Sequence, residues 1–477
     1  MYASPVFPLK LAYGKAWQTG FWCRFKFVSG RLGWRGACSF LAVGAALLAA
    51  SVVIGEPMAV LAQEEAARKQ KQGTQAQPCG QAPQAQPCGQ GTAVVTKAKE
   101  GTEFTPVPLV GGSSDVGIGG GAMVSYAVTR PGFSPYVFRL ELFSMTTMKG
   151  RDDGLYVSYQ DHYFMAHWPH VIKDQFSFKV RASFTRESAL RYYGLGNVSH
   201  LPPSANLTDQ RFKYDRLHPE LRLYGLVHLT KRLVLDLRVN YTLNWLDFGG
   251  DTRLAQDLAD PELSLTDPGH FHQVVYLGAG VQWDARDTPV ATSRGHLQTL
   301  RVDWAPGGTR ALAMPYRFAR FNVASHFYVP VFGPASVLAF RLLGDFLLGD
   351  APVYELARFN DTSAFGGPEG VRGIPGQRYH GKLKVFGNLE WRQVLFGFPF
   401  LGKQNKLAAV VFADAGRLWS GVSKWAKRLD GKTLRVHYGL GGGLRLLAGC
   451  SFVIRADVAW SRDARPVGAY FGAGQVF

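Results

Sequence analysis

Apolar and polar residues alternate one by one along most of the sequence after residue 101. In RLVLDLRVNYTLNWL (232–246), large apolar side chains occupy every odd position, and Asp, Arg, Asn and Thr occupy most even positions. The stretches KLKVFGNLEWR (382–392) and SFVIRADVAW (451–460) follow the same pattern with few exceptions. Because successive side chains of a strand point to opposite faces, this period predicts β-strands with one apolar and one polar face. No convincing helical period of useful length competes with it.

Two features of these strands favour a membrane barrel over a soluble β-sandwich, whose strands also alternate. The polar faces carry full charges of both signs, and the apolar faces are large and often end in Trp or Tyr. That combination is typical of a barrel with a wet lumen and aromatic girdles. The predicted strands are also long for a sandwich, and their length suits a tilted membrane crossing.

The predicted strands can be counted backward from the C-terminal end of the sequence. They lie near 116–128, 135–147, 153–165, 174–187, 212–228, 232–246, 272–284, 295–305, 316–330, 336–348, 381–397, 406–419, 436–447, 451–461 and 469–477. Single-chain bacterial barrels have an even number of strands, so one more is expected upstream. The only candidate is TEFTPVPLV (102–110), in which Pro106 and Pro108 remove two ladder donors. The sequence therefore predicts an all-β fold, a sixteen-stranded antiparallel transmembrane barrel closed by a weak seam between 102–110 and 469–477.

The connections between these strands fall into two sets. Since the strand number is even, both ends of the barrel lie on the periplasmic side, and successive connections alternate between the two faces. The long connections then fall on the outer face and the short turns on the periplasmic face; the long ones are 188–211, 247–271, 349–380 and 420–435. Outer-membrane barrels show this asymmetry.

The segment before the barrel divides into two parts. Basic residues within 24–35 precede an apolar run at 37–55, and the small-residue exit Val60-Leu61-Ala62 suits signal peptidase. We predict a signal peptide or targeting region over 1–62, with a membrane anchor as the rival interpretation. Residues 63–101 are rich in Gln, Ala, Gly, Pro and Lys and contain QAQPCGQ twice, so we predict a low-complexity disordered linker. The barrel domain is predicted to span 102–477.

Composition narrows the classes of function. Charged residues make up 18% of the chain, below the roughly 25% of soluble proteins, and the net charge is +18, of which +11 lies in 102–477. A basic barrel domain suits binding of nucleic acid, binding of lipopolysaccharide phosphates or a basic lumen. The sequence contains neither a basic helix nor an aromatic binding platform that would support a nucleic-acid partner.

Of the five cysteines only Cys450 lies in the barrel domain, and we predict no metal site and no cofactor. No Gly-x-Ser-x-Gly elbow is present, and we nominate no catalytic residue.

One loop stands out. Between 365 and 382, six glycines and two prolines surround Val371-Arg372-Gly373, a composition that suits neither a helix nor a central strand. The stretch VRGIPGQRYHGKLKVFGNLEWR (371–392) resembles the signature of the bacterial surface antigen superfamily, the barrels of outer-membrane assembly factors of the BamA/TamA type. Four other stretches agree with this resemblance and occur in the family's order: RYYGLGN (191–197), WDARDTPVATSRGH (283–296), VFADAGRLW (411–419) and YFGAGQVF (470–477).

The resemblance implies roles for several residues. The loop of Val371, Arg372 and Gly373 would fold into the lumen, and Arg372 would pair with Asp414 of the barrel wall. Glu390 is a plausible second acid, since both carboxylates fall in phase with inward positions. Arginine suits this role because its planar fork binds a carboxylate at two points. Phe477 would end the last strand as the C-terminal barrel signature.

The resemblance also implies a function and a location. We expect a bacterial outer-membrane barrel that is not an enzyme and that takes part in assembly, insertion or translocation of protein or lipid. The alternative is a passive pore or structural surface antigen. In the family, assembly and secretion members carry periplasmic POTRA modules before the barrel. No such pattern precedes the barrel in this sequence, which argues against an autonomous assembly function. The expected partners are outer-membrane lipid and lipopolysaccharide, client membrane proteins or lipids, and an unidentified periplasmic partner.

Overall fold

The computed structural model describes residues 100–151, 154–199, 209–263, 265–266, 269–309, 312–359, 370–400, 403–448 and 452–477. The predicted targeting region 1–62 and all but the last two residues of the predicted linker 63–101 lie outside these residues.

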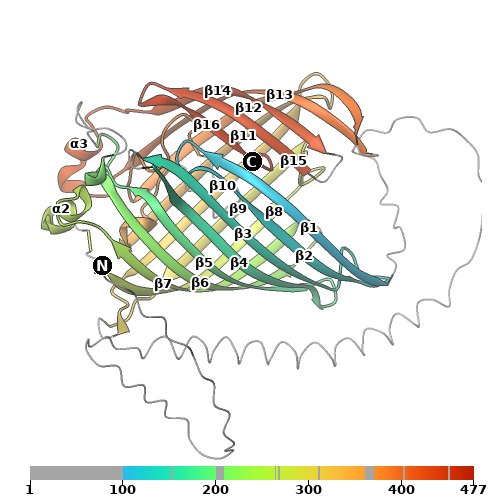
Figure 1. Cartoon of the computed structure of the whole chain (residues 1–477), viewed down its shortest axis with the longest axis horizontal. Coiled ribbons are helices and arrows are strands. Elements are labelled where there is room, and N and C mark those ends of the chain that lie inside the picture. The colour runs from blue at the N-terminus through green and yellow to red at the C-terminus, as the bar shows by residue number, and fades with distance from the viewer. Residues whose placement is uncertain are drawn as a thin grey trace, which may run out of the picture. The chain divides into compact units, whose positions relative to one another are not determined.

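Sixteen strands form one closed barrel in which each strand pairs with its neighbours in sequence and β1 pairs with β16 (Figure 1). The strands are β1 (Gly101–Ser113), β2 (Gly117–Thr129), β3 (Phe138–Arg151), β4 (Gly154–Ile172), β5 (Phe176–Arg191), β6 (Lys213–His228), β7 (Leu233–Asp247), β8 (Phe271–Asp284), β9 (Gly295–Ala305), β10 (Arg317–Pro330), β11 (Ser336–Asp350), β12 (Leu383–Phe400), β13 (Lys403–Trp419), β14 (His437–Ala448), β15 (Phe452–Ser461) and β16 (Ala464–Ala473). The predicted strand number and antiparallel fold are confirmed.

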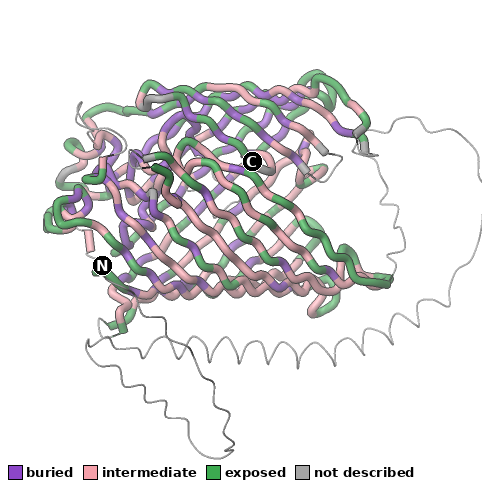
Figure 2. The backbone as a smooth tube through the Cα atoms, viewed as in Figure 1, coloured by how far each residue is buried: buried purple, intermediate pink, exposed green. Residues whose placement is uncertain are grey.

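The burial of the strands is inverted relative to a soluble protein. Along β7, Leu237 is 46% exposed, whereas Asp236 is 7% exposed and Asn244 is fully buried. Trp391 on β12 is 44% exposed and Glu390 beside it is fully buried. Buried and exposed positions alternate in this way along many strands (Figure 2). The apolar faces therefore point outward to lipid and the polar faces line the lumen, as the alternation predicts.

The longer connections gather at one end of the barrel, where they carry the short helices α2 (Arg253–Ala259) and α3 (Ala426–Leu429) (Figure 1). The 3₁₀ turns η1 (Gln210–Phe212), η2 (Pro261–Leu263), η4 (Val353–Glu355) and η6 (Ser423–Trp425) belong to the same connections. A cluster of buried apolar side chains, among them Tyr192, Leu254 and Tyr354, packs loops against strand ends there. No helix of the described residues is long and apolar enough to cross a membrane.

Two glycines of β8 make room for lumenal charges. A Cβ on Gly278 would lie 2.4 Å from Asp303 Oδ1, and a Cβ on Gly280 would lie 2.8 Å from the Arg301 side chain. Arg301 in turn bonds Asp236 at 3.2 Å. The wall thus pairs its buried charges with each other, as burial of charge requires.

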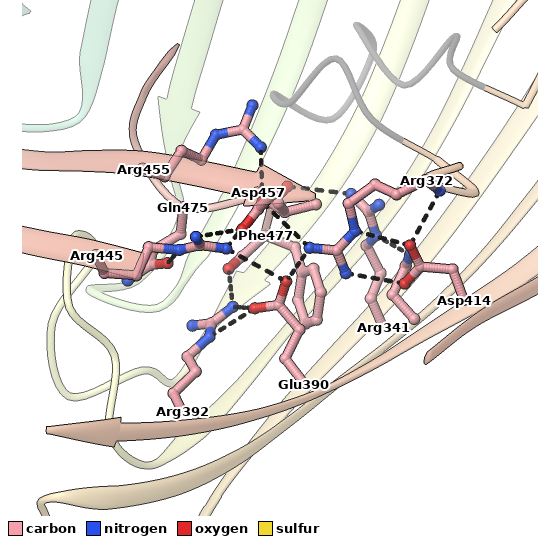
Figure 3. Close-up of polar contacts among 12 residues, drawn as sticks. Arg341, Arg372, Glu390, Arg392, Asp414, Arg445, Arg455, Asp457, Gln475 and Phe477 are labelled. Carbon is pink, nitrogen blue, oxygen red and sulfur yellow. Dashed lines mark hydrogen bonds and ion pairs between the residues drawn. The ribbon is translucent and has the colours of Figure 1, made fainter. Parts of the chain in front are cut away.

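The last strand differs from the prediction. The sequence predicts a strand over 469–477 that ends at Phe477, but β16 begins at Ala464 and ends at Ala473. The chain turns at Gly474, whose φ is +86°, a conformation that glycine adopts without steric cost. Phe477 then lies inside the barrel among the lumenal side chains (Figure 3). Alternation alone could not reveal this turn, because the residues after Gly474 bind partners that are distant in sequence.

Candidate functional site: the lumenal loop and its ionic network

The loop between β11 and β12 reaches into the lumen and packs against the wall. Val371 and Ile374 are each 2% exposed and share an apolar cluster with Phe359, Tyr379 and Phe386. Residues 370–382 of the glycine-rich loop are therefore a packed part of the barrel interior rather than a solvated surface segment.

Arg372 is the centre of the contacts between this loop and the wall. Its Nε donates to Asp414 Oδ2 at 2.7 Å and its Nη2 donates to Asp414 Oδ1 at 2.9 Å, which is the two-point fork expected of arginine. Its Nη1 donates to Glu390 Oε1 at 2.6 Å. Its backbone N–H also donates to Asp414 Oδ2, at 3.0 Å. The structure thus brings together the three residues Arg372, Asp414 and Glu390 that the sequence nominates.

The environment of Arg372 stabilises its charged form. The side chains of Arg372, Asp414 and Glu390 are all fully buried. Burial opposes the charge of the guanidinium, but Asp414 and Glu390 outweigh it and raise the pKa of Arg372 above its ordinary value. The guanidinium carbon also lies 3.4 Å from the centroid of the Phe412 ring, which attracts the cation.

Glycines on the loop and on the wall permit this close approach. Gly373 has a φ of +89°, and its N–H donates to Tyr470 Oη at 2.8 Å. On β14, a Cβ on Gly439 would lie 1.7 Å from the carbonyl oxygen of Arg372. Gly439 of β14 therefore leaves the space that the loop backbone occupies.

The network around Arg372 includes residues that sequence reasoning did not nominate (Figure 3). Asp457 on β15 lies 3.5 Å from Arg372 Nη1 and accepts from Arg445 Nη1 at 2.5 Å. Arg392 Nε donates to Glu390 Oε2 at 2.8 Å. The alternation along β12, β14 and β15 predicts that these charged side chains face the lumen. It does not predict which of them meet across the lumen.

Other connections between strands also contact the loop. Gly196 in RYYGLGN donates its N–H to the His380 carbonyl at 2.7 Å. Gly376 donates to Asp115 Oδ2 at 3.0 Å, which joins the loop to the β1–β2 turn. Arg378 donates to the Ser199 carbonyl at 2.7 Å. The loop is therefore held at its tip by the wall and at its base by other loops.

We call the contacts of Arg372 with Asp414 and Glu390 the clamp, because they hold the loop against the barrel wall. Each acid is matched with guanidinium donors, so the charges neutralise each other inside a barrel that would otherwise be wide enough for a channel. Among the described residues, no group of three or more His, Cys, Asp or Glu side chains could hold a metal ion.

The fold and the clamp define a class of protein: a sixteen-stranded transmembrane barrel with one loop bound inside its lumen. Among solved structures, the chain resembles BamA from Haemophilus ducreyi lacking POTRA domains 1–3, with a TM-score of 0.54, 12% identity, and coverage of 79% of this chain and 70% of that chain. CdiB from Escherichia coli matches with a TM-score of 0.46 and 13% identity, over 77% of this chain and 62% of that chain. A search of curated proteins found no match.

The family follows from the sequence itself. Residues 153–477 match the model of the Omp85 superfamily domain. The chain belongs to the Omp85 superfamily and is a β-barrel of the bacterial outer membrane. The predicted resemblance to BamA-type barrels is confirmed.

Proposed function

We propose that this barrel takes part in assembly, insertion or translocation of protein or lipid at the outer membrane. Two features support the proposal: a seam with few contacts and a lumenal loop held by a clamp. Barrels of the Omp85 superfamily are nonenzymatic insertion or translocation channels, and no catalytic role is proposed for this chain. The partners are outer-membrane lipid, lipopolysaccharide and client proteins or lipids, with an unidentified periplasmic partner.

The seam between β1 and β16 is the observation that carries this proposal. Only Gly112 and Ser113 of β1 have register partners in β16, namely Phe471 and Tyr470. By contrast, β1 pairs with β2 along its whole length, from Gly101 to Ser113. Each missing pair removes ladder hydrogen bonds that hold two strands together. The wall is therefore weakest where a client could pass between lumen and membrane.

The clamp gives the same barrel a closed resting state. Arg372 ties the loop to β12 and β13 through Glu390 and Asp414, and the neighbouring Gly373 ties it to Tyr470 on the seam strand β16. Asp115, beside the seam, also accepts a bond from loop residue Gly376. Movement of the loop and loosening of the seam are thereby linked through shared contacts.

A seam crosslink tests the proposal. Ser114 donates its N–H to the Ala469 carbonyl at 3.1 Å, so cysteines at these two positions would lock the seam. The matched control is a pair at Leu237 and Ala279, which are register partners within the fully paired β7–β8 wall. Growth of cells that depend on the barrel, and membrane integrity, are measured under oxidising and reducing conditions.

We expect the seam crosslink, but not the control crosslink, to abolish function while the barrel stays folded. Full function with a locked seam would contradict the proposal and favour the passive pore or structural surface antigen.

A further inference from the structure

Five polar side chains lie together on the wall formed by β3, β4 and β5, which are neighbours in the barrel (Figure 1). Thr146, Gln160 and Arg186 are opposite one another in the strand register. Ser144 and His162 form the adjacent pair, two residues further along β3 and β4. We call these five residues the polar column.

The polar column faces lipid and not the lumen. On β3, Leu142 is 54% exposed whereas Glu141 is 4% exposed, and on β5, Phe184 is 42% exposed whereas Thr185 is 8% exposed. Side chains two residues apart share a face of a strand, and so do register partners on neighbouring strands. The polar column therefore shares the outward face of Leu142 and Phe184.

The depth of the column follows from the strand geometry. Trp168 lies near the short β4–β5 turn and contacts Phe138 and Phe178, so this group marks the aromatic girdle at the periplasmic boundary. Gln160 is eight residues from Trp168 along β4. At a rise of about 3.3 Å per residue and a tilt of about 40°, this separation is about 20 Å in depth. Because the apolar band is about 25 Å tall, the column lies in the outer leaflet, inside the band.

The outward face becomes apolar again beyond the column. Met148 and its register partner Ile118 are 48% and 75% exposed. The polar column therefore interrupts the apolar band and does not mark its edge. The outward face of β11 shows no such interruption, since every second residue from Leu338 to Leu348 is apolar or glycine.

The column offers hydrogen-bonding groups that the chain does not use. Ser144 Oγ and His162 Nδ1 lie 2.9 Å apart and share one hydrogen bond, which leaves His162 Nε2 free. Thr146, Gln160 and Arg186 make no side-chain hydrogen bond or ion pair with another described residue. Unbonded polar groups and lipid-facing arginines are destabilising in hydrocarbon. A ligand that bonds them removes this cost.

A hollow in the outer surface adjoins the polar column. Its volume is about 580 Å³, and Ser144 and His162 contribute to its lining. Ala122 and Ala182 supply small side chains, and Leu142, Phe164 and Phe184 supply larger apolar ones. An apolar hollow of this kind accommodates an acyl chain beside the polar groups.

We propose that the polar column and the adjoining hollow bind a lipopolysaccharide molecule of the outer leaflet. Arg186 binds a phosphate of the lipid, because a guanidinium donates two parallel hydrogen bonds to phosphate oxygens and a long side chain reaches toward the head group. The other four residues bind amide, ester and hydroxyl groups at the top of the acyl chains, and one chain fills the hollow.

The position of the column argues for this lipid. Polar groups extend over two rows of side chains below the head-group level, which matches a lipid whose acyl chains carry polar groups beneath its phosphates. The inference deepens the lipopolysaccharide partner named under the proposed function, and it rests on that proposal only for the presence of this lipid.

A binding titration tests the assignment. The purified full chain in detergent micelles is titrated with purified lipopolysaccharide, and the bound fraction is measured by native mass spectrometry. Arg186→Leu should weaken binding by roughly tenfold, the effect of losing a hydrogen bond to a charged group. Arg317→Leu is the matched control, because Arg317 is an exposed arginine at the start of β10, and its affinity should equal that of the parent. Unchanged affinity in Arg186→Leu, or equal losses in both variants, would overturn the site.

Two other lipids identify the group that is recognised. Lipopolysaccharide stripped of its phosphates should bind the parent and Arg186→Leu equally, and a remaining difference would overturn the role of the phosphate. Phosphatidylglycerol supplies an anionic phosphate without the deeper polar groups and should bind the parent more weakly. Equal affinities for phosphatidylglycerol and lipopolysaccharide would overturn the assignment to lipopolysaccharide.

Stability provides a second readout that does not depend on micelles. In phosphatidylcholine vesicles, Arg186→Leu should unfold at a higher urea concentration than the parent, because its arginine no longer faces hydrocarbon. Lipopolysaccharide added to the vesicles should raise the midpoint of the parent more than that of the variant. Equal increases would contradict the site. Because no readout here is transport, failure of this inference is distinguishable from failure of the proposed function.

Discussion

Replacing Arg372 with alanine removes the centre of the clamp. The substitution deletes the side-chain bonds to Asp414 at 2.7 and 2.9 Å and the bond to Glu390 at 2.6 Å. Glu390 keeps its bond to Arg392, but Asp414 keeps only the backbone N–H of residue 372 among these partners. The variant therefore leaves a buried carboxylate without its main counter-charge.

The magnitude follows from burial. The side chains of both Arg372 and Asp414 are fully buried, and removal of one partner of such a pair costs about 3–5 kcal/mol. Water in the lumen lowers this value by screening the remaining charge. Arg372→Lys keeps the charge but loses the two-point fork, so we expect a smaller loss of unfolding free energy from it.

Two assays report the effect. Urea unfolding of the barrel from phospholipid vesicles measures stability, and planar-bilayer recording measures whether the loop leaves the lumen. We expect Arg372→Ala to lower the unfolding midpoint and to raise or destabilise the current, with Arg372→Lys between it and the parent. The exposed Arg232→Ala is the control. Equal stability and equal current for Arg372→Ala and Arg232→Ala would refute the clamp.

Two other predictions concern the glycine that admits the loop and a carboxylate outside the membrane strands. Gly439→Ala should raise the current as Arg372→Ala does, because its Cβ would lie 1.7 Å from the Arg372 carbonyl oxygen. The control Gly120→Ala should leave the current unchanged, because its Cβ would meet no atom closer than 3.4 Å. Equal currents in the two variants would contradict the role of Gly439 in admitting the loop. For Asp463, burial opposes ionisation, but the hydrogen bond and charge of His437 outweigh it and lower the pKa of the carboxyl. Its folded pKa is thus below the unfolded value of about 3.9, so its stabilisation is complete above about pH 4 and lost as pH falls through the folded pKa. Asp463→Asn should unfold more easily than the parent at pH 6 and converge with it in strong acid; parallel pH curves would contradict this.

The barrel can be predicted from the sequence because the alternation of apolar and polar residues is a local signal. Alternation in 232–246 needs only neighbouring residues, and the structure forms β7 over Leu233–Asp247. The expected strand 102–110 is β1, Gly101–Ser113, and its two prolines do lie at a poorly paired edge.

The site was only partly predictable, because its contacts join distant parts of the chain. Arg372, Asp414 and Glu390 were nominated through the resemblance, and they meet in the lumen. Asp457 and Arg445 belong to the same network, but only the closed barrel brings β14 and β15 against the loop. The inward turn after β16 is not predictable for the same reason, because Arg341, Arg392 and Arg445, which donate hydrogen bonds to residues 475–477, lie on other strands.

A double-mutant cycle on Arg372 and Asp414 tests the docked loop most directly. The free energy of unfolding is measured for the parent, Arg372→Ala, Asp414→Ala and the double variant in the same vesicles. If the two side chains form one buried pair, the double variant loses less stability than the sum of the single variants, with a coupling of about 1–3 kcal/mol. Losses that add to within about 0.5 kcal/mol would show that the two residues act independently and would contradict a loop docked on the barrel wall.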